Sequence, residues 1–333
     1  MNKVILITGT STGFGRTATE TLAQRGYRVF ATMRDISGRN ADTSERLRSL
    51  ANRKGWNLDV LEMDVTNDVS VNQAVQQALD RAGRIDVVIN NAGIAGQGVT
   101  EAYTVEQFQQ VLDVNLFGVL RVNRAVLPAM RRQRSGLLIH VSSGLGRFVI
   151  PGFAVYSASK FALEAVADAY RFDLAPLGID SVIVEPGIHR TPILERFLDP
   201  ADQDRVAEYG TTAEALERVK GIFEGASTAP ETPGPEGVVE AFVRLIETPA
   251  GERPFRTVPT ASIQPLLEPY NALAATMRDT LAQIFKVPEL TVLQPAASSG
   301  GTKNGNGTLE VGDREKKQTA KGRSEETEVK TPR

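Results

Sequence analysis

Short apolar runs recur along the first 258 residues of the chain, and segments with helical periodicity separate them. The first run, Val4 to Ile7, is apolar at every position, as in a strand that is buried on both faces of a sheet. The other runs lie at 28–32, 56–63, 85–89, 136–141, 181–184 and 255–258. Each run is short enough to form one strand of a central sheet.

Amphipathic helical patterns fill most intervals between these runs. They cover 14–25, 69–81, 104–111, 115–131 and 237–246, and a further helical run begins at Tyr156. Thr104 and Gln107 have the spacing of a capping box at the start of one of these helices. Strands that alternate with helices predict an α/β fold with a parallel, doubly wound sheet. Ligands of such sheets bind at the carboxyl ends of the strands.

Polar residues and glycines follow the predicted strands directly. After the apolar runs come Thr8-Gly9, Asp64-Val65, Asn90-Asn91-Ala92-Gly93, Ser142-Ser143 and Glu185-Pro186-Gly187. Because the carboxyl ends of parallel strands share one edge of the sheet, we expect these segments to lie together. The sequence therefore predicts a ligand site at that edge.

The first strand leads into a glycine-rich turn, Thr8 to Gly15, and then into the helix that begins near Phe14. Glycine lets the backbone approach a pyrophosphate closely, and the helix N-terminus behind the turn supplies N–H groups and the positive end of a dipole. This β-α-β unit is typical of a Rossmann-type dinucleotide-binding fold. A turn that only connects the strand to the helix is the simpler alternative.

The same turn contains a second motif. Gly9 to Gly13 reads G-x-S-x-G, the pattern of a hydrolase nucleophile elbow centred on Ser11, and His140 and His189 lie downstream as possible bases. Against this hypothesis, no earlier strand-to-helix loop exists to donate the second oxyanion N–H. A serine hydrolase would also leave Gly15 and the tyrosine and lysine at positions 156 and 160 without a role.

Tyr156 and Lys160 are four residues apart on a predicted helix and therefore share one face. A lysine cation near a phenol is expected to stabilise the phenolate and lower its pKa from about 10. Such a pair can exchange a proton with an alcohol or a carbonyl. On its own the spacing also occurs on solvated helix faces.

Composition narrows the function classes. The net charge of −2 and the pI near 5.9 give no electrostatic reason to expect a nucleic acid or an anionic membrane as partner. The chain has no cysteine, which excludes disulfides, thiolate metal sites and cysteine nucleophiles. No metal site is predicted. The apolar run after Met1 is too short for a signal peptide or a membrane span, and we expect a cytoplasmic protein.

Over residues 1–258 the chain resembles a classical short-chain dehydrogenase/reductase. The family's cofactor motif T-G-x-x-x-G-x-G matches Thr8, Gly9, Gly13 and Gly15, its N-N-A-G matches 90–93, and its Y-x-x-x-K matches Tyr156 and Lys160. The order and the spacing of the three motifs together are highly specific. The resemblance implies an oxidoreductase that transfers hydride between a nicotinamide cofactor and a CH–OH group.

The resemblance also implies roles for single residues. Tyr156 would be the acid/base, Lys160 would bond the nicotinamide ribose, Ser143 would polarise the substrate oxygen, and Asn115 would tie Lys160 to a water chain. The implied cofactor-binding residues are Thr8, Gly9, Ser11, Thr12, Gly13, Phe14, Gly15, Arg34, Asp64, Val65, Asn91, Ala92, Gly93, Tyr156, Lys160, Pro186, Gly187 and Thr191. A non-catalytic dinucleotide sensor is the alternative within this fold.

The segment after the second strand bears on cofactor choice. Enzymes that prefer NAD place a carboxylate at the end of this strand, and Met33 occupies that position here. Arg34 follows, where NADP-preferring members of the family carry a basic residue. We therefore expect NADP(H) to be preferred, with NAD(H) possible if Asp35 binds the ribose hydroxyls instead.

The remaining sequence predicts a single catalytic domain with additions. Residues 189–236, rich in Pro and Gly, would form a substrate lid, 259–294 a C-terminal helical extension, and 295–333 a disordered tail because large apolar residues are scarce there. Apolar residues at 144–153 flank the catalytic groups and favour a lipophilic small-molecule substrate. The resemblance further implies a homodimer or homotetramer through the helices that carry Asn115 and Tyr156.

Overall fold

The computed structural model describes residues 2–294, in which seven parallel strands form one sheet of order β3-β2-β1-β4-β5-β6-β7. The predicted doubly wound α/β fold is confirmed. The strands are β1 Val4–Thr8, β2 Arg28–Met33, β3 Leu58–Glu62, β4 Val87–Asn90, β5 Gly136–Val141, β6 Ile179–Val184 and β7 Arg256–Thr257. The predicted disordered tail, residues 295–333, lies outside the described residues.

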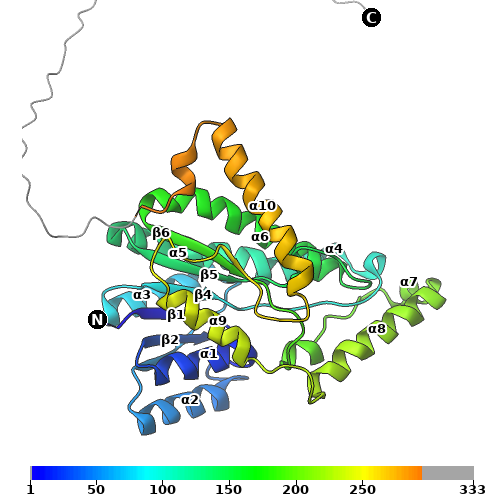
Figure 1. The fold of residues 1–333 in the computed structure, drawn as a ribbon. Coiled ribbons are helices and arrows are strands. Elements are labelled where there is room, and N and C mark those ends of the chain that lie inside the picture. Colours follow the sequence, from blue (N-terminus) through cyan, green and yellow to red (C-terminus); the bar gives the residue numbers. More distant parts are fainter. Residues whose placement is uncertain (1, 295–333) are drawn as a thin grey trace, which may run out of the picture. The chain divides into compact units, whose positions relative to one another are not determined.

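Helices cover both faces of the sheet (Figure 1). The α-helices are α1 Gly13–Gln24, α2 Ala41–Lys54, α3 Asp68–Ala82, α4 Val105–Leu112, α5 Gly118–Gln133, α6 Ala154–Leu174, α7 Gln203–Glu208, α8 Thr211–Thr228, α9 Glu236–Glu247 and α10 Gln264–Ile284. A π-helical turn, Asp113–Phe117, joins α4 to α5. None of the helices described here is long and apolar enough to cross a membrane.

The pleat of β1 distributes its apolar side chains between two cores. Ile5 and Ile7 pack with α1 and α9 on one face, whereas Val4 and Leu6 pack with α3 and α5 on the other. All four side chains are buried, as the continuous apolar run predicts. Burial on both faces fixes the register of the central strand against its neighbours.

The strand order changes direction beside β1, because β2 pairs on one side and β4 on the other. The chain leaves β1 toward β2 and leaves β4 toward β5, in opposite directions along the sheet. This divergence opens a crevice between the carboxyl ends of β1 and β4. Thr8, the last residue of β1, spans this point: its Oγ1 accepts hydrogen bonds of 3.0 Å from the backbone N–H groups of Asn91 and Ala92. The two predicted motif segments are thus held side by side.

Several predicted boundaries differ from the structure. The helix α2 was not predicted, because only Ser44, Leu47 and Ala51 are buried along it and the rest of its surface is polar. Trp56 lies outside β3, and β7 contains only two of the four predicted residues. The capping box of Thr104 and Gln107 is present as predicted.

Candidate active site

A cavity of about 1030 Å³ lies at the carboxyl ends of the central strands. Residues that follow β1, β2, β4, β5 and β6 line it, together with parts of the predicted lid and the start of α10. Sixteen of the predicted residues line this cavity: Gly9, Ser11, Thr12, Gly13, Phe14, Arg34, Val65, Asn91, Ala92, Gly93, Ser143, Tyr156, Lys160, Pro186, Gly187 and Thr191. Thr8, Gly15, Asp64 and Asn115 are not part of the lining.

The glycine-rich turn is shaped by close backbone contacts. Gly9 has a φ of 68°, and a Cβ there would lie 2.8 Å from the Cα of Ala92. A Cβ on Gly15 would lie 2.3 Å from the carbonyl oxygen of Gly9 and 2.5 Å from Nδ2 of Asn91. Neither contact is possible, so both positions require glycine. At these two glycines no side chain covers the backbone in front of the α1 N-terminus, which leaves room for a pyrophosphate. We call this turn, Gly9 to Gly15, the glycine cradle.

Tyr156 and Lys160 lie in the wall of the cavity on the first turns of α6. The Lys160 Nζ lies 5.6 Å from the centre of the Tyr156 ring and donates a hydrogen bond of 2.9 Å to the carbonyl oxygen of Val141. Lys160 is 5% exposed. The Lys160 ammonium is therefore held by the Tyr156 ring and the end of β5 and is shielded from solvent. A lysine that takes part in catalysis needs such a fixed position.

The pKa of Tyr156 differs from the sequence prediction. Burial raises the pKa of Tyr156 to about 12, and the neighbouring Ser143 hydroxyl acts in the opposite direction without cancelling it. Burial also lowers the pKa of Lys160 to about 8, against the charge of Glu164. The net lowering of the Tyr156 pKa that the sequence predicts is therefore wrong for this structure, because desolvation of the phenolate dominates.

Asn115 lies in the π-helical turn and is fully buried. Its side-chain amide accepts a hydrogen bond from the N–H of Ile94 and donates one to the carbonyl oxygen of the same residue, each 2.9 Å. It also donates to Oγ of Ser159, which donates in turn to the Tyr156 carbonyl oxygen. Asn115 thus joins the Asn90–Gly93 segment to the first turn of α6. Its predicted water chain to Lys160 stays a prediction.

Ser143 lies two residues after the end of β5 and caps the short helix Gly144–Gly146, where its Oγ accepts a hydrogen bond of 3.1 Å from the N–H of Leu145. Its hydroxyl is also the polar neighbour of Tyr156. Ser142 is 3% exposed, and its Oγ has no hydrogen-bond partner among the described residues. Of the two serines, Ser143 is therefore the one placed to act with the tyrosine.

The turn after β2 brings two guanidinium groups to the cavity. Arg34 and Arg39 both line it, and neither forms an ion pair within the described part of the chain. Asp35 has a φ of 55°, and its carboxylate accepts a hydrogen bond of 2.8 Å from the N–H of Arg39. The Asp35 carboxylate is therefore hydrogen-bonded to the backbone of its own turn. The sequence alone allows Asp35 to bind the ribose hydroxyls instead. Arg39 was not among the predicted residues, because it belongs to none of the motifs.

Asp64 follows β3 next to the cavity-lining Met63 and Val65. Burial opposes ionisation of Asp64, but hydrogen bonds from Thr66 and the charges of Arg34 and Arg121 outweigh it and lower the pKa of the carboxyl. Its Oδ1 accepts both the N–H and the hydroxyl of Thr66. The carboxylate is thus ionised and positioned, as an acceptor for an amino group must be.

The two histidines do not form a hydrolase centre with Ser11. His140 is buried in the core, where its ring nitrogens face Asn90 and Ser181, and burial lowers its pKa to about 3. His189 lines the cavity, but its Nδ1 faces the carbonyl oxygen of Gly187 and its ring packs edge-on against Phe14. Within residues 2–294 neither ring is hydrogen-bonded to Ser11. A nucleophile without a base is not activated.

The far end of the cavity is apolar. Phe153 at the start of α6 packs against two residues from the predicted lid, with ring centroids 5.5 Å from Phe197 and 4.7 Å from Phe223. Ile263 and Leu266, at the start of the C-terminal extension, also line the cavity. Among the described residues, no group of histidine, aspartate and glutamate side chains is arranged to hold a metal ion.

Comparison with known proteins agrees with this geometry. Residues 3–202 match the short chain dehydrogenase family model. The chain is 39% identical over 189 residues to a 3-ketodihydrosphingosine reductase of Bacteroides thetaiotaomicron, covering 57% of this chain and 65% of that protein. It is 34% identical over 255 residues to human retinol dehydrogenase 8, covering 74% of this chain and 78% of that protein.

Solved structures show the same architecture. A short-chain dehydrogenase from Streptomyces avermitilis matches with a TM-score of 0.68 and 27% identity over 86% of this chain and 97% of its own. A Burkholderia phymatum short-chain dehydrogenase/reductase in complex with NAD is 22% identical, with a TM-score of 0.67 over 80% of this chain and 92% of its own. ElxO with NADP bound is also 22% identical, with a TM-score of 0.60 over 78% of this chain and 96% of its own. The chain belongs to the short-chain dehydrogenase family, whose members are oxidoreductases that act on CH–OH groups.

Proposed function

We propose that this protein is an NADP(H)-dependent reductase that transfers hydride between the nicotinamide and a lipophilic ketone or aldehyde, or the corresponding alcohol. One observation carries the proposal: Ser143, Tyr156 and Lys160 lie in the wall of a cavity that also contains the glycine cradle. A cofactor seated on the cradle and a substrate at the apolar end would meet at these three side chains. A sensor would not need this arrangement.

The residues of the chain suit carbonyl reduction. The cofactor, when bound, supplies the hydride. Tyr156, whose pKa is about 12, carries its proton at neutral pH and can donate it to the carbonyl oxygen, as a general acid must. The Ser143 hydroxyl can donate a second hydrogen bond to the same oxygen. The Lys160 ammonium stabilises the phenolate that remains after the proton has left.

The apolar end of the cavity supports a lipophilic substrate. Phe153, Phe197 and Phe223 supply aromatic surface there, and a buried methylene is worth about 0.8 kcal/mol. NADPH consumption should therefore be measured across methyl ketones and aldehydes of increasing chain length. We expect kcat/KM to rise by roughly two- to fourfold per added methylene until the cavity is full. An optimum at the shortest ketones would argue against a lipophilic substrate.

The reaction should lose rate in alkali because of Lys160. Burial lowers the pKa of this amine to about 8, so its charge is present below that pH and is lost as the pH rises through it. Tyr156 keeps its proton over the same range because its pKa is higher. We expect kcat/KM for ketone reduction to fall between pH 7.5 and 9.5, as steady-state rates can show. A flat profile would mean that the lysine charge does not contribute.

Two further expectations stay proposals. The exposed Phe117 lies in the π-helical turn, and the exposed Phe161 lies on α6. Both belong to the helical segments expected to join subunits, which supports a homodimer or homotetramer. The absence of cysteine supports a cytoplasmic setting, and the net charge of −2 gives no reason to propose nucleic acid or membrane as partner. Light scattering of the purified protein would determine the number of subunits.

A further inference from the structure

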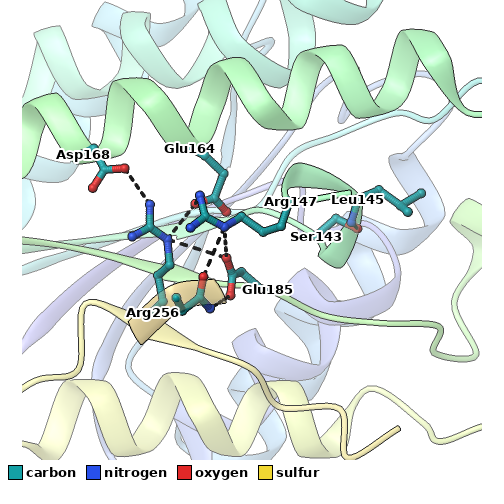
Figure 2. A network of polar contacts seen from close by, with 8 residues as sticks. Ser143, Leu145, Arg147, Glu164, Asp168, Glu185 and Arg256 are labelled. Atoms are coloured by element: carbon teal, nitrogen blue, oxygen red, sulfur yellow. Dashed lines mark hydrogen bonds and ion pairs between the residues drawn. The ribbon is translucent and has the colours of Figure 1, made fainter. Parts of the chain in front are cut away.

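A cluster of buried charges lies in the same region of the fold as Ser143 (Figure 2). It contains the guanidinium groups of Arg147 and Arg256 and the carboxyl groups of Glu164 and Glu185, all 9% exposed or less. The Arg256 Nε lies 2.9 Å from Glu164 and 3.6 Å from Glu185, and Arg147 Nε lies 3.5 Å from Glu185. Burying four ionisable groups is costly, and simple packing does not require them.

Each of three cluster members belongs to a segment that also carries a predicted site residue. Arg147 directly follows the short helix that Ser143 begins. Glu164 lies one helical turn after Lys160 on α6, and its charge acts on the lysine pKa. Glu185 directly precedes Pro186 and Gly187, and the Pro186 carbonyl oxygen accepts a hydrogen bond from the N–H of Gly144. Movement within the cluster would therefore reach the whole catalytic end of the cavity.

Asn271 of α10 completes this cluster from a distant part of the sequence. Its Oδ1 accepts a hydrogen bond of 3.1 Å from Arg147 Nε, and its Nδ2 donates one of 2.5 Å to Glu185 Oε2. The neighbouring Tyr270 ring lies 4.3 Å from the Arg147 guanidinium carbon. One amide thus bonds a buried cation and a buried carboxyl at the same time.

The cluster depends on this amide for hydrogen bonds. Glu185 Oε1 and Arg147 Nη2 have no hydrogen-bond partner among the described residues, so Asn271 provides the single side-chain donor that Glu185 receives there. Burial and the charge of Glu164 raise the pKa of Glu185 to about 8, against the hydrogen bond from Asn271 and the charges of Arg256 and Arg147. Without Asn271 the ion pairs would remain, but Arg147 and Glu185 would each lose a buried hydrogen bond, which favours a shift of their segments.

We propose that Asn271 is a positioning residue, which through Arg147 and Glu185 holds the Ser143 turn and the Pro186–Gly187 segment in their catalytic arrangement. The inference rests on the proposed reductase function for its kinetic part. Under this proposal one residue of the C-terminal extension, Asn271, supports the active-site segments directly. Asn271 itself does not line the cavity and would not touch the substrate.

The test compares two variants of the full chain. Asn271→Leu removes both hydrogen bonds at similar volume. Ala282→Gly, at a buried position of α10 that is outside the cluster, weakens the helix by about 1 kcal/mol and serves as the matched control for loosened docking. Both proteins are examined by peptide hydrogen exchange over residues 142–150 and 184–190. Their kcat is measured with NADPH and decanal or 2-decanone, and their NADPH dissociation constants by calorimetry.

We expect Asn271→Leu to accelerate exchange in both peptides and to lower kcat by about 10- to 100-fold, with the NADPH dissociation constant within threefold of the parent. The control should lose thermal stability while it keeps parental exchange in those peptides and kcat within twofold. Equal effects of the two variants, or unchanged exchange in Asn271→Leu, would overturn the proposal. If the parent shows no turnover, the proposed function fails, and the exchange comparison still decides the role of Asn271.

Discussion

Replacing Tyr156 with phenylalanine should lower the turnover of ketone reduction by about 10²–10⁴-fold, the usual contribution of a positioned acid. The phenyl ring keeps the volume and the contact with Lys160, so the cavity and the cofactor cradle should be unchanged. The oxygen that would give its proton to the substrate is the sole group removed. Steady-state kinetics with NADPH in excess would measure the loss.

The specificity of this effect is checked by binding. The dissociation constant of NADPH should stay within a few-fold of the parent value, because the substitution leaves the glycine-rich turn unchanged. Tyr170→Phe is a matched control, since Tyr170 is a half-buried tyrosine on the same helix that does not line the cavity. Normal turnover in the Tyr156 variant would remove this residue from the mechanism.

Removing both guanidinium groups of the turn after β2 should change cofactor preference. Each charge-assisted hydrogen bond to a phosphate is worth about 1.5–3 kcal/mol, so Arg34→Ala or Arg39→Ala alone should weaken NADPH by roughly 10- to 100-fold. The double variant should lose about 10²–10³-fold. NADH lacks the 2′-phosphate, and its affinity should change less than threefold. Calorimetric titration of both nucleotides would measure the shift.

The same titrations contain their own control. Arg16 lies on the outer side of α1 paired with Glu20, and Arg16→Ala should leave both affinities unchanged. Equal weakening of NADPH and NADH in the double variant would show that the arginines support the turn and do not bind a phosphate. A parent protein that prefers NADH would refute the assignment of NADP(H) directly.

The sequence was sufficient for the sheet and for most of the cavity lining. Continuous apolar runs identify strands buried on both faces, and the residues after them necessarily share one edge. The segments at 8–15, 90–93, 142–143 and 185–187 meet there for this reason. The sequence spacing of Tyr156 and Lys160 likewise predicts their proximity, because both residues lie on the same helix.

The remaining features depend on contacts between distant residues. Arg39 lines the cavity from a turn in which Asp35 adopts a left-handed conformation and accepts a hydrogen bond from the Arg39 N–H, and no sequence pattern indicates this geometry. The raised pKa of Tyr156 reflects burial by surrounding segments rather than its neighbour Lys160. The cluster of Arg147, Glu185 and Asn271 joins three segments far apart in the sequence, so no motif indicates it.

Transfer of deuterium from the cofactor to a substrate tests the central claim most directly. Purified protein would be incubated with NADPH deuterated at C4, in separate 4R and 4S preparations, and with decanal or 2-decanone. Mass spectrometry of the product should find one deuterium on the carbinol carbon from one of the two preparations, and almost none with the Tyr156→Phe variant. Binding of NADPH without deuterium transfer to any member of the ketone and aldehyde panel would contradict the reductase function and indicate a non-catalytic sensor.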